Sequence, residues 1–345
     1  MGFSNHQSLS TSATLASRRR VSGAKLAIDW VEKAESVIHF LKQIGFQQSD
    51  IRKIVSDEPR ILLSRVSQTL KPKIKLLNDL GLSGSDLVQA VVRHPVILRQ
   101  RLGPAIHAFR TVLGSDENVV RAINNSHWIQ FSKAANNLIP NVELLQSYSG
   151  ISGEKIQKHI IRHPSLYCMT TDLFRKILTR VENKLGIPPN SVMLFYGIKC
   201  VAQLSDQSID DKCEIFKSFG WTQSDVMELI RRNPLCLTST EEKLKEKLDF
   251  LINQLGYKPD YLAFQASFFT YSIEKRLLPR HQVLQVLKEK GLIKEHHLLS
   301  SASILTEANF LKKFIFPFEE IHEVYAQLTG STVESLGAGR VKGHI

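Results

Sequence analysis

The sequence contains few of the residues from which catalytic or metal sites are commonly built. Its 345 residues include only four cysteines and no CxxC pair, a pattern that fits neither a disulfide framework nor a zinc site. We therefore expect small core residues in a reducing compartment at Cys168, Cys200, Cys213 and Cys236. A P-loop, a GxSxG motif and a marked pair of carboxylates are also missing. These absences predict a protein that is not an enzyme and that has neither catalytic residues nor a cofactor.

Metal sites, membrane spans and strands are disfavoured as well. His159 and His163 have a spacing compatible with a metal, but no third ligand recurs nearby, so no metal site is predicted. No run approaches the roughly 18 apolar residues of a membrane-spanning helix, so membrane insertion is not expected. Strand signals are nearly absent, and the chain is therefore predicted to be all-α.

What the sequence does have is a surplus of positive charge. It contains 45 Lys plus Arg against 33 Asp plus Glu, which gives a formal net charge of +12. Residues 1–30 carry +3 of this charge and the remaining chain carries +9, so the surplus belongs mainly to the body of the chain. Such a surplus favours a polyanionic partner or an anionic surface.

The two ends of the chain differ in composition from its body. Residues 1–28 contain no acid, are rich in Ser and Thr and include Arg18 to Arg20, which predicts an organellar transit peptide or, alternatively, a disordered leader. Residues 329–345 are Gly-rich and basic, and we expect a disordered tail there. Residues 29–328 lie between these ends and form the predicted helical array.

A proline-centred pattern recurs four times, at Pro59, Pro95, Pro164 and Pro234. A glycine stands 14 residues before each proline, and apolar residues stand eight and four residues before it. The spacing predicts a glycine turn, then a helix with one apolar face, then a proline that ends this helix. Three serines stand ten residues before a proline and are predicted to be N-caps: Ser49, Ser85 and Ser224.

A second kind of helix is predicted between these units, with a proline near its start, at Pro72, Pro104, Pro140 and Pro279. Degenerate copies of the turn lie near residues 127, 200, 266 and 304, so about eight units fit between residues 30 and 320. A unit this small must bury its apolar face against its neighbours. The predicted fold is an α-solenoid of right- or left-handed curvature, closed by one helix over residues 311–325.

Three segments carry a likeness to a known family, namely residues 93–98, 162–167 and 272–280. The first two are Arg-His-Pro turns, and the third, Ser-Ile-Glu-Lys-Arg-Leu-Leu-Pro-Arg, is similar to a family segment Ser-x-Glu-Lys-Arg-x-x-Pro-Arg. The chain resembles the mitochondrial transcription termination factor (mTERF) family, and within it the plant members, over residues 31–325. The resemblance implies repeats of two α-helices and a short 3₁₀ turn, with a basic concave face that holds nucleic acid.

The resemblance also implies a place of action. Family members act in mitochondria or chloroplasts, on transcription, its termination, or RNA processing such as splicing. The plant branch favours the mitochondrion here, with the chloroplast as the alternative. Ala266 stands where a turn proline is expected, and the units around residues 127 and 200 lack the proline, which puts a strict binding code of one contact per repeat in doubt.

One repeat position provides the first candidate contacts with nucleic acid. Arg93, Arg162 and Arg232 stand two residues before a turn proline, and Arg231 precedes the last of them. Asp57 stands at this position in the first copy, so any row of cations along the repeats starts after the first copy. Stacked repeats would align these cations along a groove that holds a phosphate backbone. The alternative, equally weighted, is that a cation in the last helical turn only complements the helix dipole.

A denser basic cluster provides the second group of candidates, which are Lys275, Arg276 and Arg280. They are expected to contact nucleic acid because the cluster adds to the positive surplus of the array, and the alternative is a solvated helix face. Four aromatic residues could stack on bases but are predicted to be core residues, namely Trp128, Tyr167, Phe268 and Phe269.

These observations lead to one leading hypothesis. The chain is predicted to be a monomeric, non-enzymatic regulator of organellar gene expression that binds double-stranded DNA or structured organellar RNA. Organellar transcription or splicing proteins are further candidate partners. The alternative is an α-solenoid scaffold that binds proteins and makes no contact with nucleic acid.

Overall fold

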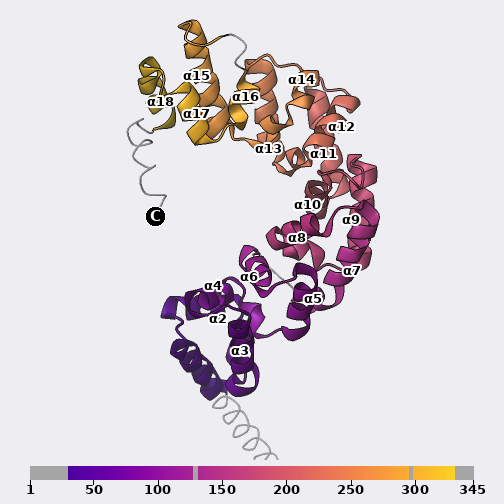
Figure 1. The fold of residues 1–345 in the computed structure, drawn as a ribbon, viewed down its shortest axis with the longest axis vertical. Coiled ribbons are helices and arrows are strands. Elements are labelled where there is room, and N and C mark those ends of the chain that lie inside the picture. The colour runs from indigo at the N-terminus through magenta and orange to yellow at the C-terminus, as the bar shows by residue number, and fades with distance from the viewer. Residues whose placement is uncertain (1–29, 127–130, 295–297, 331–345) are drawn as a thin grey trace, which may run out of the picture. The chain divides into compact units, whose positions relative to one another are not determined.

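The computed structural model describes residues 30–126, 131–294 and 298–330. Every regular element in these ranges is an α-, 3₁₀- or π-helix and none is a strand (Figure 1). The predicted all-α repeat fold is therefore confirmed. The predicted leader and all but the first two residues of the predicted tail lie outside the described residues.

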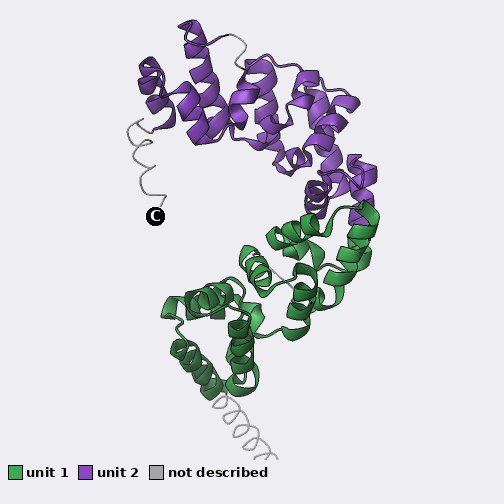
Figure 2. Cartoon of the chain, in the orientation of Figure 1, with its two compact units in different colours: residues 1–175 green, residues 176–345 purple. Residues whose placement is uncertain are grey.

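The chain divides into two compact units, residues 1–175 and residues 176–345 (Figure 2). Unit 1 begins with helical residues 30–43. Its further elements are α2 (Gln48–Asp57), η1 (Pro59–Leu63), η2 (Val66–Leu70), α3 (Lys71–Asp79), α4 (Gly84–Arg93), η3 (Pro95–Leu98), α5 (Gly103–Leu113), α6 (Asp116–Asn125), α7 (Phe131–Ser149), α8 (Gly153–Arg162) and η4 (Pro164–Tyr167). Helix α9 (Thr171–Leu185) contains the dividing residue.

Unit 2 continues with the same alternation of helices and turns. Its elements are α10 (Leu194–Gln203), α11 (Asp206–Ser218), α12 (Gln223–Arg232), η5 (Pro234–Thr238), α13 (Glu241–Leu248), η6 (Asp249–Gln254), α14 (Pro259–Phe264), η7 (Ala266–Thr270), η8 (Ile273–Leu277), α15 (Leu278–Glu289), α16 (Leu299–Ile304), α17 (Glu307–Phe314), η9 (Glu319–Ile321) and α18 (His322–Thr329). A repeat thus consists of a first helix, a turn and a second helix, as the resemblance implies.

The repeat prolines stand where the first helix has just ended, as predicted. Helices α2, α4, α8 and α12 each end two residues before the proline, and a short 3₁₀ helix begins at the proline itself. The residue between them leaves the α region: His94, for example, has φ −132° and ψ 68°. The cause is the proline ring, which excludes helical backbone from its predecessor. At the other end of these helices, Gly81 has φ 103° and Gly150 has φ 64°, a left-handed conformation that strains residues with a Cβ.

The N-caps of these first helices lie earlier than predicted. The N-cap residues of α2, α4, α8 and α12 are Gln47, Ser83, Ser152 and Thr222. The prediction of Ser49, Ser85 and Ser224 is therefore wrong, because each helix has 10 residues, two more than that spacing allows. The three serines lie in the first turn instead.

The prolines of the second helices have less uniform positions than predicted. Pro104 is the second residue of α5, where its missing N–H breaks no helical bond. Pro72 and Pro279 are the second residues of α3 and α15, but the π-helical turns η2 and η8 lead directly into these helices. Pro140 lies inside the 19-residue α7, so its prediction as a helix start is wrong. The apolar face of α7 continues upstream of this proline through the buried Phe131.

The end of the array also differs from the prediction. The single closing helix expected over residues 311–325 is two helices, α17 and α18. Pro317 stands between them, and a proline interrupts a helix because it lacks the N–H donor and its ring clashes with the preceding turn. Phe310 of α17 and Tyr325 of α18 are both buried and their rings lie 6.4 Å apart, so the two helices still cover a common apolar surface.

In three repeats a lysine side chain connects the second helix to the turn that follows in the next repeat. Lys73 of α3 donates to the carbonyl oxygen of Leu98 at 2.6 Å, and Lys212 of α11 donates to that of Leu237 at 2.7 Å. Lys247 of α13 donates in the same way to carbonyls at the end of η7. The last carbonyls of a helix have no partner within it and attract a cation. We call these contacts carbonyl clasps.

Arginine and asparagine form equivalent clasps where the lysine is missing. Arg180 of α9 donates to the carbonyl oxygens of Val201, at 3.0 Å, and Leu204, at 2.9 Å. The buried Asn141 of α7 donates to the carbonyl oxygen of Tyr167 at 2.9 Å. The repeats linked by these clasps are therefore joined by a specific polar contact in addition to apolar packing.

The core contains the aromatic and cysteine residues that the sequence predicts there. Tyr167, Phe268 and Phe269 are buried, which confirms their prediction as core residues, while Trp128 lies outside the described residues. All four cysteines are buried free thiols, as expected. Burial raises the pKa of the Cys168 thiol to about 12, so this thiol is protonated and unreactive at neutral pH.

Candidate nucleic-acid interface

The predicted arginine position is the last residue of the first helix in each repeat. From α2 to α16 this residue is Asp57, Arg93, Asn125, Arg162, Gln203, Arg232, Phe264 and Ile304. The position is thus polar or charged in the first six repeats and apolar in the last two. We call it the helix-end position.

Arg93 and Arg162 differ in how far they are available to a ligand. Arg93 is half-buried, and its guanidinium donates to the backbone carbonyl of Asn124 in the next repeat. Arg162 is exposed, and its side chain has no hydrogen bond or ion pair with any described residue. Arg93 therefore has a structural role like that of the clasps, whereas the guanidinium of Arg162 is open to an anion.

Arg231 and Arg232 are held by one carboxylate. Glu228 accepts hydrogen bonds from Arg231 Nη2 at 3.0 Å and from Arg232 Nε at 2.6 Å. These bonds, first that of Arg231 and then that of Arg232, lower the pKa of Glu228 below its ordinary value. The Arg232 guanidinium also lies over the ring of Phe264, 4.5 Å from its centroid. Both arginines remain exposed at the surface but are oriented by their neighbours.

Arg280 does not lie on the surface. Its side chain is buried, and its Nη1 donates to the carbonyl oxygens of Ala302, at 2.7 Å, and Leu305, at 2.8 Å. Its Nη2 pairs with Glu307 at 2.7 Å. Burial lowers the pKa of Arg280, but arginine stays charged at any physiological pH. The predicted contact of Arg280 with nucleic acid is therefore not supported, because its guanidinium is buried and is bonded to backbone carbonyls near the end of α16 and to Glu307.

The other two residues of this basic cluster also separate into two classes. Arg276 is half-buried, clasps the carbonyls of Ser303 and Leu305, and lies over the ring of Tyr271. Lys275 is exposed, and its ammonium has no partner among the described residues. Of the predicted set, Arg162 and Lys275 are therefore free to bind, and Arg231 and Arg232 are exposed but paired.

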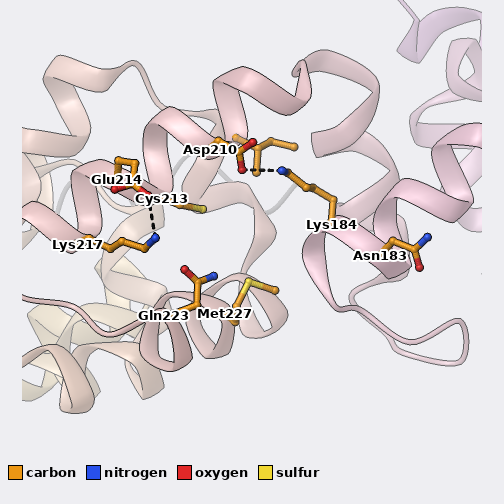
Figure 3. Close-up of a pocket in the computed structure, with 9 residues that line it drawn as sticks. Asn183, Lys184, Asp210, Cys213, Glu214, Lys217, Gln223 and Met227 are labelled. Carbon is orange, nitrogen blue, oxygen red and sulfur yellow. Dashed lines mark hydrogen bonds and ion pairs between the residues drawn. The ribbon is translucent and has the colours of Figure 1, made fainter.

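A polar cavity of about 350 Å³ lies between α9, α11 and α12 (Figure 3). Its two lysines are both neutralised, since Lys184 pairs with Asp210 at 2.6 Å and Lys217 pairs with Glu214 at 2.8 Å. Cys213 also lines the cavity, and burial raises the pKa of its thiol, which makes it a poor nucleophile. The cavity offers neither an activated nucleophile nor an unpaired charge.

The described residues contain no group of three or more metal-ligating side chains placed to hold a metal ion. The rings of His159 and His163 lie 5.0 Å apart, but His159 Nδ1 is hydrogen-bonded to the Tyr167 hydroxyl at 2.7 Å. Across the described ranges, no helix is both long enough and apolar enough to span a membrane.

The family model of mTERF matches residues 38–149 and 99–311, which together cover most of the chain. The chain belongs to the mTERF family. Three curated Arabidopsis thaliana relatives are similar to it. Transcription termination factor MTERF15, mitochondrial, is 20% identical over 308 residues, 86% of this chain and 58% of the relative. Transcription termination factor MTERF8, chloroplastic, is 22% identical over 267 residues, 76% of this chain and 51% of the relative.

The third relative, transcription termination factor MTEF18, mitochondrial, is 27% identical over 105 residues, 30% of this chain and 19% of the relative. This mTERF chain spans about half the length of the first two relatives. The resemblance to plant members of the family is thereby confirmed.

The two units of this mTERF chain differ in charge, which the residue-by-residue predictions missed. Among the described residues, unit 1 has 19 Lys plus Arg and 12 Asp plus Glu, whereas unit 2 has 20 and 18. Nine exposed cations of unit 1 have side chains without a partner among the described residues: Lys42, Lys53, Arg60, Lys71, Lys75, Arg101, Lys133, Lys155 and Arg162. A charge count by halves of the sequence would have revealed this difference.

Proposed function

We propose that this mTERF protein is a non-enzymatic regulator of organellar gene expression that binds nucleic acid through the exposed cations of unit 1. The relatives are named as termination factors of mitochondria and chloroplasts, which supports an organellar role in transcription, its termination or RNA processing. We propose the mitochondrion as its compartment, with the chloroplast as the alternative, and a monomer as its state.

The single observation that carries the proposal is Arg162. It is exposed at the helix-end position and has no protein partner among the described residues, although a carboxylate would be the usual one. A planar guanidinium can bind a phosphate through two parallel hydrogen bonds. The helix dipole alone would also favour a cation in this last turn, but it does not account for the excess of Lys and Arg over Asp and Glu among the described residues of unit 1.

The proposal is tested by binding of the full-length protein to a labelled DNA duplex and to structured RNA at several salt concentrations. Each phosphate contact on B-DNA contributes about −0.9 to the slope of log affinity against log salt. Arg162→Gln should therefore weaken binding and make the slope shallower by about 0.9. Arg121→Gln is the matched control, because the exposed Arg121 is already paired with Glu117 at 2.7 Å.

Two results would contradict the proposal. One is the absence of binding to either nucleic acid at low salt. The other is an equal effect of Arg162→Gln and Arg121→Gln, which would mean that the free guanidinium has no special role. A stable protein partner that survives nuclease treatment, together with the first result, would favour the scaffold function instead.

A further inference from the structure

The helix-end position changes from a charged to an apolar residue within unit 2. Arg232 is followed in the next repeat by Phe264, and then by Ile304. Both apolar residues are 58% exposed. Helices α14 and α16, which carry them, are neighbours linked by the hydrogen bond from the Tyr261 hydroxyl to Ser300 Oγ at 3.1 Å.

The Phe264 ring is oriented by a charged partner. The Arg232 guanidinium lies 4.5 Å from the ring centroid and covers part of one face. Arg232 is itself fixed by Glu228, through the 2.6 Å bond between its Nε and the carboxylate. Because the ring stays largely exposed in spite of this contact, it has apolar surface left for a ligand.

We infer that Phe264 and Arg232 form a stacking site for an unpaired nucleobase, so that unit 2 binds a single-stranded segment of nucleic acid. The inference rests on the proposed function and deepens it. Every base has a π-face that can stack on an aromatic ring, and arginine planes stack on bases in the same way. Bases in a continuous duplex are already stacked on each other, so the site selects single strands.

A nucleobase fits this surface better than a protein side chain does, for two reasons. The surface lies at the repeat position that carries a free arginine on α8 of unit 1 and a paired arginine on α12. Glu228 takes only the Nε of Arg232, so the two Nη groups of this exposed guanidinium can donate to the phosphate that every nucleotide carries.

The test uses full-length protein and a single-stranded RNA that contains 2-aminopurine, whose fluorescence is quenched by stacking, together with a duplex DNA of the same length. Three variants are compared: Phe264→Trp keeps the aromatic face, Phe264→Leu keeps an apolar side chain without it, and Val192→Ala alters another exposed apolar residue of unit 2. Circular dichroism confirms that each variant is folded.

We expect Phe264→Leu to weaken single-strand binding about 5- to 150-fold, the range for loss of one base–aromatic stack. It should also abolish the quenching and leave duplex binding and the salt slope unchanged. Phe264→Trp and Val192→Ala should bind like the parent protein. Equal single-strand binding by Phe264→Leu and the parent protein would overturn the inference but not the proposed function.

Two further outcomes separate the two proposals. If the parent protein binds neither nucleic acid, the proposed function fails and the inference fails with it. If Phe264→Leu loses a protein partner but no affinity for RNA, the surface is a protein-binding site and the inference is wrong.

Discussion

The arginines of the two units have different surroundings. All five described arginines of unit 2 are engaged: Arg180 and Arg280 clasp carbonyls and pair with acids, Arg276 clasps carbonyls, and Arg231 and Arg232 share Glu228. In unit 1, Arg60, Arg101 and Arg162 are exposed and have no partner among the described residues. Every described arginine of unit 2 is therefore engaged within the protein, whereas three arginines of unit 1 are available to an anion.

A second difference concerns the starts of the second helices. In unit 2, Ser205, Thr240 and Ser272 are N-caps whose side chains accept a backbone N–H. In unit 1, the residues before η2 and α5 are Arg65 and Leu102, and neither caps with its side chain. At these starts of second helices, side chains of unit 2 thus accept backbone N–H groups that have no side-chain acceptor in unit 1. The proposed polyanion binding by unit 1 goes with fewer of these capping bonds at the starts of its second helices.

The largest expected effect comes from the most buried arginine. Arg280→Met should lower the free energy of unfolding by about 3–5 kcal/mol, because the buried guanidinium donates to the Ala302, Ser303 and Leu305 carbonyls and pairs with Glu307, and hydrogen bonds of a charged group contribute about 1.5–3 kcal/mol each. Denaturant unfolding followed by circular dichroism measures this change in the free energy of unfolding. Lys290→Met, at an exposed lysine of the same unit, is the control and should change stability by less than about 0.5 kcal/mol. Similar losses for the two variants would refute the structural role of Arg280.

A medium effect is expected at the lysine clasps. Lys212→Met should lower the free energy of unfolding by about 1–3 kcal/mol, because the Leu237 carbonyl is left without its donor. Lys73→Met removes the equivalent bond in unit 1, but Lys73 is only half-buried, so water can replace the lysine and the loss should be smaller. Thermal unfolding of both variants measures which one loses more stability. A larger loss of stability for Lys73→Met than for Lys212→Met would contradict the prediction.

The smallest change in stability is expected for Glu228→Gln. This substitution removes the carboxylate that pairs with Arg231 and Arg232 in unit 2. The pKa of Glu228 is lowered in the folded state, so its contribution to stability is present above its unfolded pKa and is lost as pH falls through the folded value. Glu228→Gln should lower stability at pH 7 by less than about 1 kcal/mol, since the pair is partly exposed. The difference from the parent protein should vanish in acid.

The same variant has a second expected result. Glu228→Gln leaves Arg231 and Arg232 without their carboxylate, so binding to duplex DNA should become tighter at low salt and its salt slope steeper. Fluorescence anisotropy measures both quantities. Unchanged binding would show that the surroundings of an arginine do not decide whether it contacts nucleic acid.

The sequence was sufficient to predict the local part of the fold. A proline restricts its own φ and the backbone of the residue before it, so Pro95 and Pro164 show where α4 and α8 end without any knowledge of tertiary structure. The start of a helix depends on weaker preferences. The predicted N-caps Ser85 and Ser224 are therefore two residues late, and the predicted helix start at Pro140 lies in the middle of α7.

The candidate site could be predicted only in part, because the role of a cation depends on residues far along the chain. Arg280 contacts carbonyls more than 20 residues away, and nothing in segment 272–280 shows that its last arginine is buried. One signal was present: Lys73 and Lys212 both stand 22 residues before a turn proline, on the apolar face of a second helix. A polar residue that recurs on such a face indicates a clasp rather than a ligand contact.

The most direct test of the division between the units compares two triple variants that remove the same charge. One is Arg60→Gln, Arg101→Gln and Arg162→Gln in unit 1, and the other is Lys245→Gln, Lys258→Gln and Lys290→Gln in unit 2, all exposed positions. The slope of log affinity against log salt on duplex DNA should become shallower by up to about 2.7 for the unit 1 variant, and by less than about 1 for the unit 2 variant. Equal changes in slope, or a larger change for the unit 2 variant, would contradict the account.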